Sequence, residues 1–318
     1  MPFTPPKESF SGKICEMGIG REGVAVSLGG QAVMPFHTFE EGPGAAPGKP
    51  AIAFEVQDVA PEDWPETVRG VFKDVSGDPV AWAAYCQDSL GADAIALRLV
   101  GTHPDRGDIK AEQAAETVSR VLGAIRVPLI VLGSNHAEKD TSVLVRVAEV
   151  LKGTNSVFGK AQEANYKTIA AAAMANDLKL IAMSELDINL SKQLNILITQ
   201  MGFNRERLIT DPMSSALSYG LEYTYSVMER IRLAALAQND PILQTPMLAD
   251  VGMYVWKVKE TLALESDVPE WGELAKRGVA WEAVTASAFL ISGADLLIMR
   301  HPDAAGAVKK FIAEMEVR

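Results

Sequence analysis

Short apolar runs alternate with amphipathic segments along most of this chain. Continuous apolar runs of four to seven residues are typical of parallel strands that are buried on both faces. The pattern therefore predicts eight such strands from residue 51 onward. The runs are AIAFEV at 51, AIALRLV at 94, VPLIVLG at 127, NSVFG at 155, LKLIAM at 178, ERLITD at 206, PMLAD at 246 and ADLLIM at 294.

The segments between these runs repeat with a helical period. Stretches such as DPVAWAAYCQDSLG, KAEQAAETVSRVLGAI and TSVLVRVAEVLK carry apolar residues at three- and four-residue steps, which predicts helices with one apolar face. Eight strand–helix units in about 265 residues match the size of a (β/α)8 TIM barrel, so we expect one over residues 51–318. An open, doubly wound sheet is the alternative, but no phosphate-binding fingerprint follows the first strand. The connection between the seventh and eighth strands is expected to be the longest and to hold two helical segments.

The first fifty residues differ from the rest because they are rich in proline and glycine. Within them, KICEMGIG and GVAVSLGG predict two short strands joined by a turn. Residues 18–23 also fit the G-x-G-x-x-G pattern of dinucleotide sites. That motif requires a helix after the glycines, whereas a strand-like segment follows here. We therefore expect residues 1–50 to be an extension with a β-hairpin that packs on the barrel's amino-terminal end.

Composition and charge exclude several classes of protein. The 318-residue chain is 48% hydrophobic, so it can bury a large core. A formal net charge of −11 argues against nucleic-acid binding, which needs clustered lysine and arginine. Neither a long uncharged apolar stretch nor a signal-peptide pattern is present, so we expect a cytoplasmic protein without a membrane partner. The chain contains only Cys15 and Cys86, and an iron–sulfur cluster usually needs four thiolates.

Enzymatic barrels place their chemistry where the strands end, and three such chemistries are testable on the sequence. The last two strand ends offer no glycine-rich cradle for a phosphosugar. Lys160 is the one candidate for a Schiff-base lysine, although we interpret it as a solvated loop residue. His103, His136 and His301 follow three different strands and lack helical H-x-x-x-H spacing, so a metal site has no support.

The stretch ITDPMSSALSYGLEYTYSVMERIRLAAL contains an unusual junction at Asp211 and Pro212. Proline cannot donate to a strand ladder, so it should end the sixth strand and hold the preceding carboxylate at the rim. Ser215 or Ser218 is expected to cap the following helix.

That helix is expected to pack on the strands through one apolar stripe, with its tyrosines facing the barrel and Glu229 paired with Arg232. The stripe consists of Leu221, Tyr225, Met228, Ile231 and Ala235.

Two long segments carry a family resemblance. DPMSSALSYGLEYTYSVMERIR (211–232) and MPFHTFEEGPGAAPGKPAIAFEVQD (34–58) resemble the small subunit of the corrinoid iron–sulfur protein, which is also the delta subunit of the acetyl-CoA decarbonylase/synthase complex. The likeness extends over nearly the whole chain. It implies a (β/α)8 barrel, similar in fold to methyltetrahydrofolate-dependent corrinoid methyltransferases, that is non-catalytic by itself. It also implies a large partner subunit that carries a [4Fe–4S] cluster and most contacts to a cobamide.

The resemblance further implies that the barrel mouth covers the upper face of the cobamide. The heterodimer would accept methyl from methyltetrahydrofolate through a methyltransferase and donate it to acetyl-CoA synthase in the reductive acetyl-CoA pathway. The chain has no D-x-H-x-x-G motif, so it gives no sign of ligating cobalt. Neutral polar groups could bind the corrin amides without burying a charge. The expected cofactor-binding residues are Thr102, Ser134, Asn135, Asn155, Ser184, Asp211 and Ser215.

Two enzymes remain as alternatives to this carrier subunit. A stand-alone pterin-dependent methyltransferase would use Asp211 and Asn135 and would bind folate as an isolated chain. A lyase or aldolase would act through Lys160 and would be trapped there by borohydride. A carrier subunit instead predicts a large apolar surface on the barrel mouth or flank.

Overall fold

The computed structural model describes residue 3 and residues 8–35, 40–41 and 49–316. Within that part, eight parallel strands form one sheet in the order β10-β9-β8-β7-β6-β5-β12-β11. A parallel bridge between Thr210 and Met247 joins its two end strands, and the Thr210 amide donates to the Pro246 carbonyl at 2.9 Å. The sheet therefore closes into a barrel, and all eight predicted strands are confirmed. They are β5 (Ala51–Gln57), β6 (Ala94–Arg98), β7 (Leu129–Leu132), β8 (Val157–Ala161), β9 (Lys179–Met183), β10 (Leu208–Asp211), β11 (Leu248–Asp250) and β12 (Leu296–Met299).

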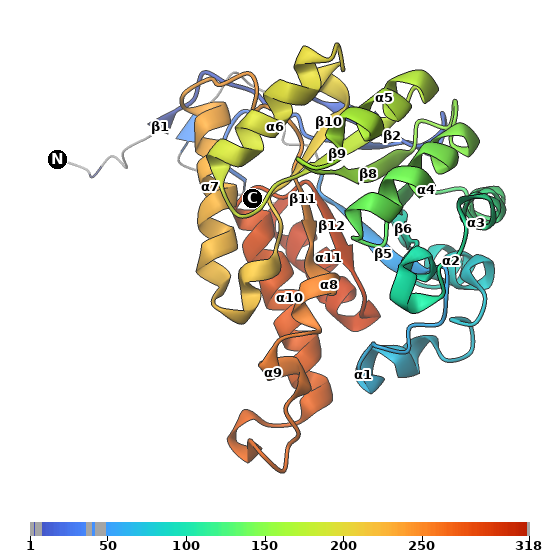
Figure 1. The fold of residues 1–318 in the computed structure, drawn as a ribbon. Helices are drawn as coiled ribbons and strands as arrows, with labels where there is room; N and C mark the ends of the chain where they lie inside the picture. The colour runs from blue at the N-terminus through green and yellow to red at the C-terminus, as the bar shows by residue number, and fades with distance from the viewer. Residues whose placement is uncertain (1–2, 4–7, 36–39, 42–48, 317–318) are drawn as a thin grey trace.

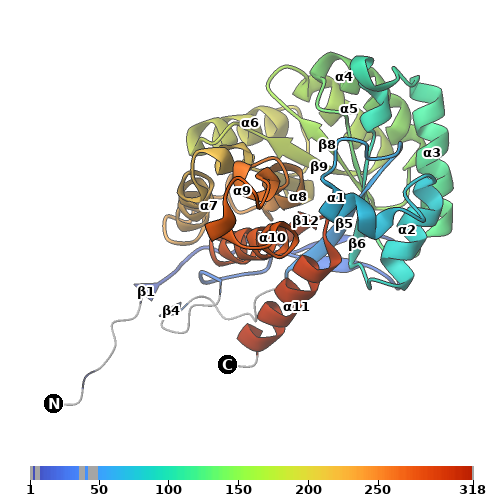
Figure 2. The same ribbon diagram turned by 90° about the horizontal axis from the view of Figure 1, so that it is seen from below.

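Helices surround the strands, as Figures 1 and 2 show from two sides. The connection from β11 to β12 is long, as expected, and holds more helical segments than the two predicted. None of the helices in the described ranges combines the length and apolar character needed to cross a bilayer. The α-helices are α1 (Glu66–Arg69), α2 (Pro79–Asp88), α3 (Ala111–Ala124), α4 (Ala137–Val150), α5 (Tyr166–Asn176), α6 (Ile188–Gln200), α7 (Leu221–Leu236), α8 (Val251–Val255), α9 (Lys259–Leu262), α10 (Leu274–Ile291) and α11 (Pro302–Glu316). The 3-10 helices are η1 (Gly70–Phe72), η2 (Val100–Thr102), η3 (Pro104–Arg106), η4 (Arg205–Arg207), η5 (Ser215–Ser218) and η6 (Pro269–Trp271).

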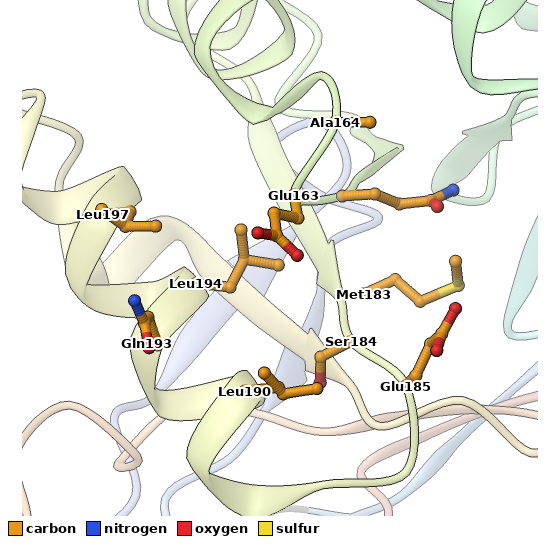
Figure 3. A pocket seen from close by; sticks show the side chains of 10 residues that line it. Glu163, Ala164, Met183, Ser184, Glu185, Leu190, Gln193, Leu194 and Leu197 are labelled. Carbon is orange, nitrogen blue, oxygen red and sulfur yellow. The ribbon is translucent and has the colours of Figure 1, made fainter.

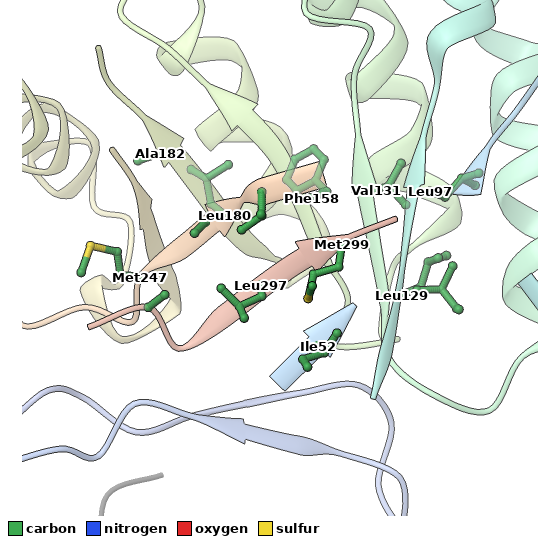
Figure 4. Packing of buried hydrophobic residues seen from close by; sticks show 14 of the residues in the cluster. Ile52, Leu97, Leu129, Val131, Phe158, Leu180, Ala182, Met247, Leu297 and Met299 are labelled. Carbon is green, nitrogen blue, oxygen red and sulfur yellow. The ribbon is translucent and has the colours of Figure 1, made fainter. Parts of the chain in front are cut away.

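Side chains along each strand alternate between two cores, because successive residues of a strand point to opposite faces. One set faces outward and packs against the helices; Figure 4 shows Ile52, Leu97, Val131, Phe158 and Leu297 among them. The other set fills the barrel interior. It includes Ala53, Ala96, Ile130, Ile181, Ile209, Leu248 and Ile298.

The amino-terminal extension contains the predicted hairpin. Strands β2 (Met17–Ile19) and β3 (Val26–Leu28) pair antiparallel; of the glycines in the G-x-G-x-x-G pattern, Gly18 lies in β2, and Gly20 and Gly23 lie in the turn. Gly20 and Gly23 have φ values of +89° and +86°, a backbone conformation that glycine adopts readily. The dinucleotide interpretation is therefore excluded in favour of the turn.

The hairpin sits at the amino-terminal end of the barrel. Its buried side chains Met17, Ile19 and Leu28 belong to the interior core. Two further strands of the extension, β1 (Glu8–Ser9) and β4 (Glu40–Glu41), pair parallel to each other. Residues 36–39 and 42–48, which include much of the 34–58 resemblance segment, lie outside the described residues. The chain division at residue 50 stays a prediction.

The start of α7 differs from expectation. The short helix η5 separates β10 from α7, and the N-cap of α7 is Gly220, at φ +156°, without a side-chain capping bond. Neither Ser215 nor Ser218 caps α7, so that prediction is wrong. A glycine at this left-handed φ lets the chain turn from η5 into α7 without the clash that a Cβ would cause.

The faces of α7 also differ in part from expectation. Met228, Ile231 and Ala235 are buried as predicted, but Tyr219 is 86% exposed and Tyr223 is 56% exposed. The tyrosines at these two positions therefore do not pack on the strands.

The expected pair between Glu229 and Arg232 is also absent. Arg232 points into the protein, where its guanidinium donates to the carboxylate of Asp295 and to the carbonyls of Thr245 and Gly293. A fully buried guanidinium requires these partners, which a surface glutamate cannot replace.

Candidate functional site

Charged side chains fill the barrel interior near its carboxyl end. All but one of them occupy the next inward positions beyond the apolar interior core, where the two-residue period of each strand points them inward. None of them is more than 5% exposed. They are Glu55 on β5, Arg98 at the end of β6, Lys160 on β8, Asp211 on β10, Asp250 on β11, and Arg300 just after β12. We call these six residues the mouth network.

Lys160 enters this network through an irregularity in β8. Val157 faces the interior and Phe158 faces the helices, so strict alternation would point Lys160 outward. The register of β8 against β9 shifts between Phe158 and Ala161, and such a bulge re-aims the side chains next to it. The Lys160 Nζ lies 2.8 Å from the Oδ2 atoms of both Asp211 and Asp250. The interpretation of Lys160 as a solvated loop residue is therefore wrong.

The protonation state of Lys160 follows from these contacts. Burial by itself would lower its pKa, but the carboxylates of Asp211 and Asp250 outweigh burial and raise the pKa above its ordinary value. The amine is thus held as an ammonium ion. A Schiff-base mechanism needs a neutral amine, so this geometry argues against an aldolase.

The remaining contacts join the network into one chain of ion pairs. Arg300 contacts Glu55 through two bonds of 3.0 Å, and Arg98 Nε donates to Glu55 at 3.0 Å. Arg98 Nη2 also donates to Asp250 at 2.7 Å. Burial alone would raise the pKa of Glu55, but Arg300 and Arg98 lower it to about 2. Three cations thus face three carboxylates, and each charge is compensated inside the barrel.

The Asp211–Pro212 junction belongs to the same network. The Asp211 carboxylate pairs with Lys160 and accepts the Met213 amide at 2.9 Å. Met213 has a φ of +60°, so the chain turns sharply after Pro212. The junction places a buried carboxylate and fixes the turn that leads to η5.

A cavity of about 230 Å³ lies beside the network at the mouth. Gln57, Arg98 and Arg300 line it from the barrel, and Ser134, Asn135 and Lys257 line it from the loops. Within the described residues, Gln57 Oε1 and Arg98 Nη1 are buried without a hydrogen-bond partner. Both side chains line the cavity, and each has one polar atom that the described residues leave unsatisfied.

Asp140 of α4 positions two predicted residues at this cavity. Its carboxylate accepts the Ser134 amide and hydroxyl at 2.7 Å each and the Asn135 amide at 2.9 Å. Asn135 has a φ of +69°, and its side chain contacts the Met253 sulfur at 3.5 Å. The β7–α4 turn thus presents the Asn135 amide at the mouth.

A second, larger cavity of about 620 Å³ lies between the end of β9 and α6. Figure 3 shows Leu190, Leu194 and Leu197 of α6 on one side and Ser184 and Glu185 on the other. The Ser184 hydroxyl is bonded to that of Ser191.

The structure brings together only part of the predicted site. Ser134 and Asn135 line the mouth cavity, Asp211 lies in the network, and Ser184 lines the second cavity. The other three predicted residues lie elsewhere. Thr102 is buried with its hydroxyl bonded to the Leu99 carbonyl at 2.7 Å, Ser215 begins η5, and Asn155 lies at the opposite end of the barrel.

Asn155 binds the hairpin. Its side-chain amide donates to the Gly18 and Gly20 carbonyls at 3.0 and 2.9 Å, and its carbonyl accepts the Gly20 amide at 2.9 Å. The sequence placed it near the start of its strand, and strand starts lie at the amino-terminal end of a barrel.

From the sequence we expected mainly neutral polar groups at the mouth and did not predict the charged mouth network beneath them. Glu55, Arg98, Asp250 and Arg300 follow the two-residue period of their strands, and that signal could have identified them as inward-facing. The three histidines considered above do not all meet: the ring centroids of His103 and His136 lie 5.4 Å apart, while His301 packs on Trp256. No group of three potential metal ligands occurs in the described part of the chain.

Known proteins match this chain over nearly its full length. A family model described as CO dehydrogenase/acetyl-CoA synthase delta subunit matches residues 16–312. The acetyl-CoA decarbonylase/synthase complex subunit delta of Archaeoglobus fulgidus is 34% identical over 321 residues, which cover 97% of this chain and 70% of that protein. Its counterpart from Methanothermobacter thermautotrophicus is 34% identical over 303 residues, 94% of this chain and 75% of that protein.

Solved structures with a similar fold include dihydropteroate synthases. The Xanthomonas albilineans enzyme with 4-aminobenzoic acid has a TM-score of 0.57 at 16% identity, covering 84% of this chain and 93% of that one. The Coxiella burnetii enzyme with pteroic acid has a TM-score of 0.54 at 13% identity, covering 86% and 96%. Identity this low shows the shared barrel fold alone.

Proposed function

We propose that this chain, which belongs to the CO dehydrogenase/acetyl-CoA synthase delta subunit family, is the non-catalytic small subunit of a corrinoid iron–sulfur methyl carrier. In this proposal a large subunit holds most of a cobamide and carries a [4Fe–4S] cluster. The barrel mouth covers the upper face of the cobamide. The heterodimer receives methyl from methyltetrahydrofolate through a methyltransferase and delivers it to acetyl-CoA synthase.

The observation that carries the non-catalytic role is the compensation of charge in the mouth network. General acid–base catalysis needs a group whose pKa lies near the working pH. Here ion pairs move the pKa of Lys160 upward and those of Glu55 and Asp250 downward. These three groups keep one charge state near neutral pH. That behaviour suits a rigid binding surface better than a proton-transfer site.

The mouth fits a cobamide that lies across it. Ligand pockets usually span roughly 300–1,000 Å³, so the mouth cavity of about 230 Å³ is too small to enclose a macrocycle. Gln57 Oε1 is a buried acceptor without a partner among the described residues, and it can accept an amide N–H of the corrin rim. Ser134 and Asn135 offer further neutral groups beside it. When bound, the cobamide supplies the cobalt that carries the methyl group.

The cysteines support a cluster in the partner subunit. Burial raises the pKa of Cys15 to about 11 and that of Cys86 to about 12, so both are protonated thiols. Cluster ligation needs thiolates, and usually four of them. This chain has two cysteines in all.

An exposed apolar surface supports docking of the large subunit. Residues 259–273, which we call the arm, extend from the β11–α10 connection, and Figure 1 shows α9 and the following loop projecting beyond α8. Leu262 and Leu264 of the arm are 47% and 58% exposed. Trp281 and Val284 of α10 are 38% and 64% exposed. Exposed apolar side chains grouped in this way mark protein–protein contacts.

Co-purification tests the proposal. The full chain is co-expressed with the large cysteine-bearing subunit, and cobalt, iron and the visible absorbance of the purified complex are measured. A stable heterodimer with cobalt and iron in the large subunit is expected, and the small chain alone should transfer no methyl group. Turnover of methyltetrahydrofolate by the small chain alone, or failure of the two chains to associate, would overturn the proposal.

A stand-alone pterin-dependent methyltransferase is the second candidate. Asn135 at the mouth cavity favours it, but Asp211, the other residue it needs, is fully buried and paired with Lys160. Titration of the isolated chain with methyltetrahydrofolate separates the two functions. Only the stand-alone methyltransferase must bind methyltetrahydrofolate without a partner subunit.

A further inference from the structure

We propose that the mouth cavity binds a small oxyanion, the carboxylate or phosphate group of an organic ligand. Its volume of about 230 Å³ lies below the roughly 300–1,000 Å³ of usual ligand pockets, which suits a small ligand. The inference goes beyond the methyl-carrier role and does not depend on it. Three features of the lining support it: an uncompensated ammonium, an unpartnered guanidinium nitrogen, and acidic residues that are paired or exposed to solvent.

The uncompensated ammonium belongs to Lys257, which follows α8 and lines the cavity. Its side chain forms no ion pair or hydrogen bond within the described ranges. Arg98 and Arg300 are its cationic neighbours, and both already pair with Glu55. Because the mouth network is neutral as a set, Lys257 adds a positive charge that the protein does not balance there.

The electrostatics of Lys257 agree with this description. Burial, followed by the charges of Arg300 and Arg98, lowers its pKa below the ordinary lysine value. An oxyanion between these groups would remove the repulsion and restore the ammonium form.

The unpartnered nitrogen is Nη1 of Arg98. The side chain is 3% exposed, and its Nε and Nη2 atoms already donate to Glu55 and Asp250. Nη1 lacks a partner among the described residues although the side chain lines the cavity. A buried guanidinium donor without an acceptor is costly, and a ligand oxygen would satisfy it.

The acidic residues of the lining do not compensate Lys257. Asp63 pairs with Arg106 at 3.0 Å, and Asp105 is 89% exposed to solvent. Arg98 and Arg300 are balanced within the mouth network and Arg106 pairs with Asp63, so Lys257 is the lining cation that has no carboxylate partner among the described residues. A positive excess in a partly enclosed cavity favours an anion over a neutral ligand.

Isothermal titration calorimetry at low ionic strength tests the proposal on the full chain, alone and in the heterodimer. The probes are inorganic phosphate, acetate and acetamide, the last being the neutral counterpart of acetate. We expect at least one anion to bind and acetamide to bind more weakly. Phosphate alone would indicate a phosphorylated ligand, and acetate alone would indicate a carboxylate.

Lys257→Gln is the test variant, because this side chain, exposed over part of its surface, forms no hydrogen bond or ion pair within the described ranges. Loss of one nearby charge should weaken anion binding roughly tenfold, given the strength of charge pairs at partly exposed sites. Lys152→Gln is the matched control, since Lys152 is also exposed but lies after α4, away from the cavity. Absence of anion binding, equal binding of acetate and acetamide, or equal affinities of the two variants would each overturn the proposal. The affinity of the chain for the large subunit is measured in a separate experiment. A failure of the proposed carrier role can therefore be distinguished from a failure of anion binding.

Discussion

Replacing Lys160 with methionine tests the compensation of charge in the mouth network. Methionine keeps an unbranched side chain of similar length but removes the ammonium that lies 2.8 Å from both Asp211 and Asp250. Asp250 retains Arg98 as a partner, whereas Asp211 keeps no cationic partner among the residues that the structure describes. Removing one partner of a buried ion pair usually costs about 3–5 kcal/mol. We expect Lys160→Met to lower the free energy of unfolding by that amount.

Urea unfolding of the full chain measures this loss. The decisive control is the same measurement on the double variant that combines Lys160→Met with Asp211→Asn. The double variant removes both charges of the pair. Its loss of unfolding free energy should therefore be roughly 2 kcal/mol smaller than the sum of the losses in the two single variants. Lowering the pH should also rescue the single variant, because an unpaired buried carboxylate folds more easily when protonated. Additive losses in the double variant, or a single variant within about 1 kcal/mol of wild type, would refute the reasoning.

Four further predictions concern separate parts of the molecule. The Glu55 pKa of about 2 lies below its ordinary value, so the ionised carboxylate stabilises the folded state. This contribution is full above pH 4.5 and is lost as the pH falls toward 2. An acid-unfolding curve of Glu55→Gln identical to that of the wild type would contradict this. Asn155→Ala should lower the unfolding free energy by about 1–3 kcal/mol, because two hairpin carbonyls lose their donor, while cobamide occupancy of the heterodimer stays unchanged. Asn135→Ala should lower that occupancy, measured from the cobalt content, and an unchanged content would remove Asn135 from the site. Leu264→Asp in the arm should weaken association with the large subunit by tenfold or more in size-exclusion or calorimetric assays, whereas the same substitution at exposed Val145 of α4 should not.

The candidate site shows where local patterns stop being informative. Ser134 and Asn135 were identified because they follow a strand directly, and their turn is positioned by Asp140 only six and five residues later. Asn155 was wrongly grouped with the residues of the mouth, although the sequence places it at the start of its strand and it precedes β8. Its function depends on the hairpin, which lies about 135 residues earlier in the chain.

The sequence by itself determined the eight strands, the helices between them and the hairpin. Each of these depends on a local signal: a continuous apolar run for a strand, apolar residues at three- and four-residue steps for a helix, or glycines that tolerate positive φ for the hairpin turn. The length of the repeating region also selected a barrel over an open sheet.

The tertiary structure decided which charges meet. Lys160 faces the interior only because a bulge shifts the register of β8, and its partners come from strands about 50 and 90 residues away. Arg232 lies on a helix whose local pattern offers Glu229, but closure of the barrel supplies a buried carboxylate on Asp295 instead. Ion pairs between distant strands depend on the geometry of the closed sheet, and no local period of the sequence encodes that geometry.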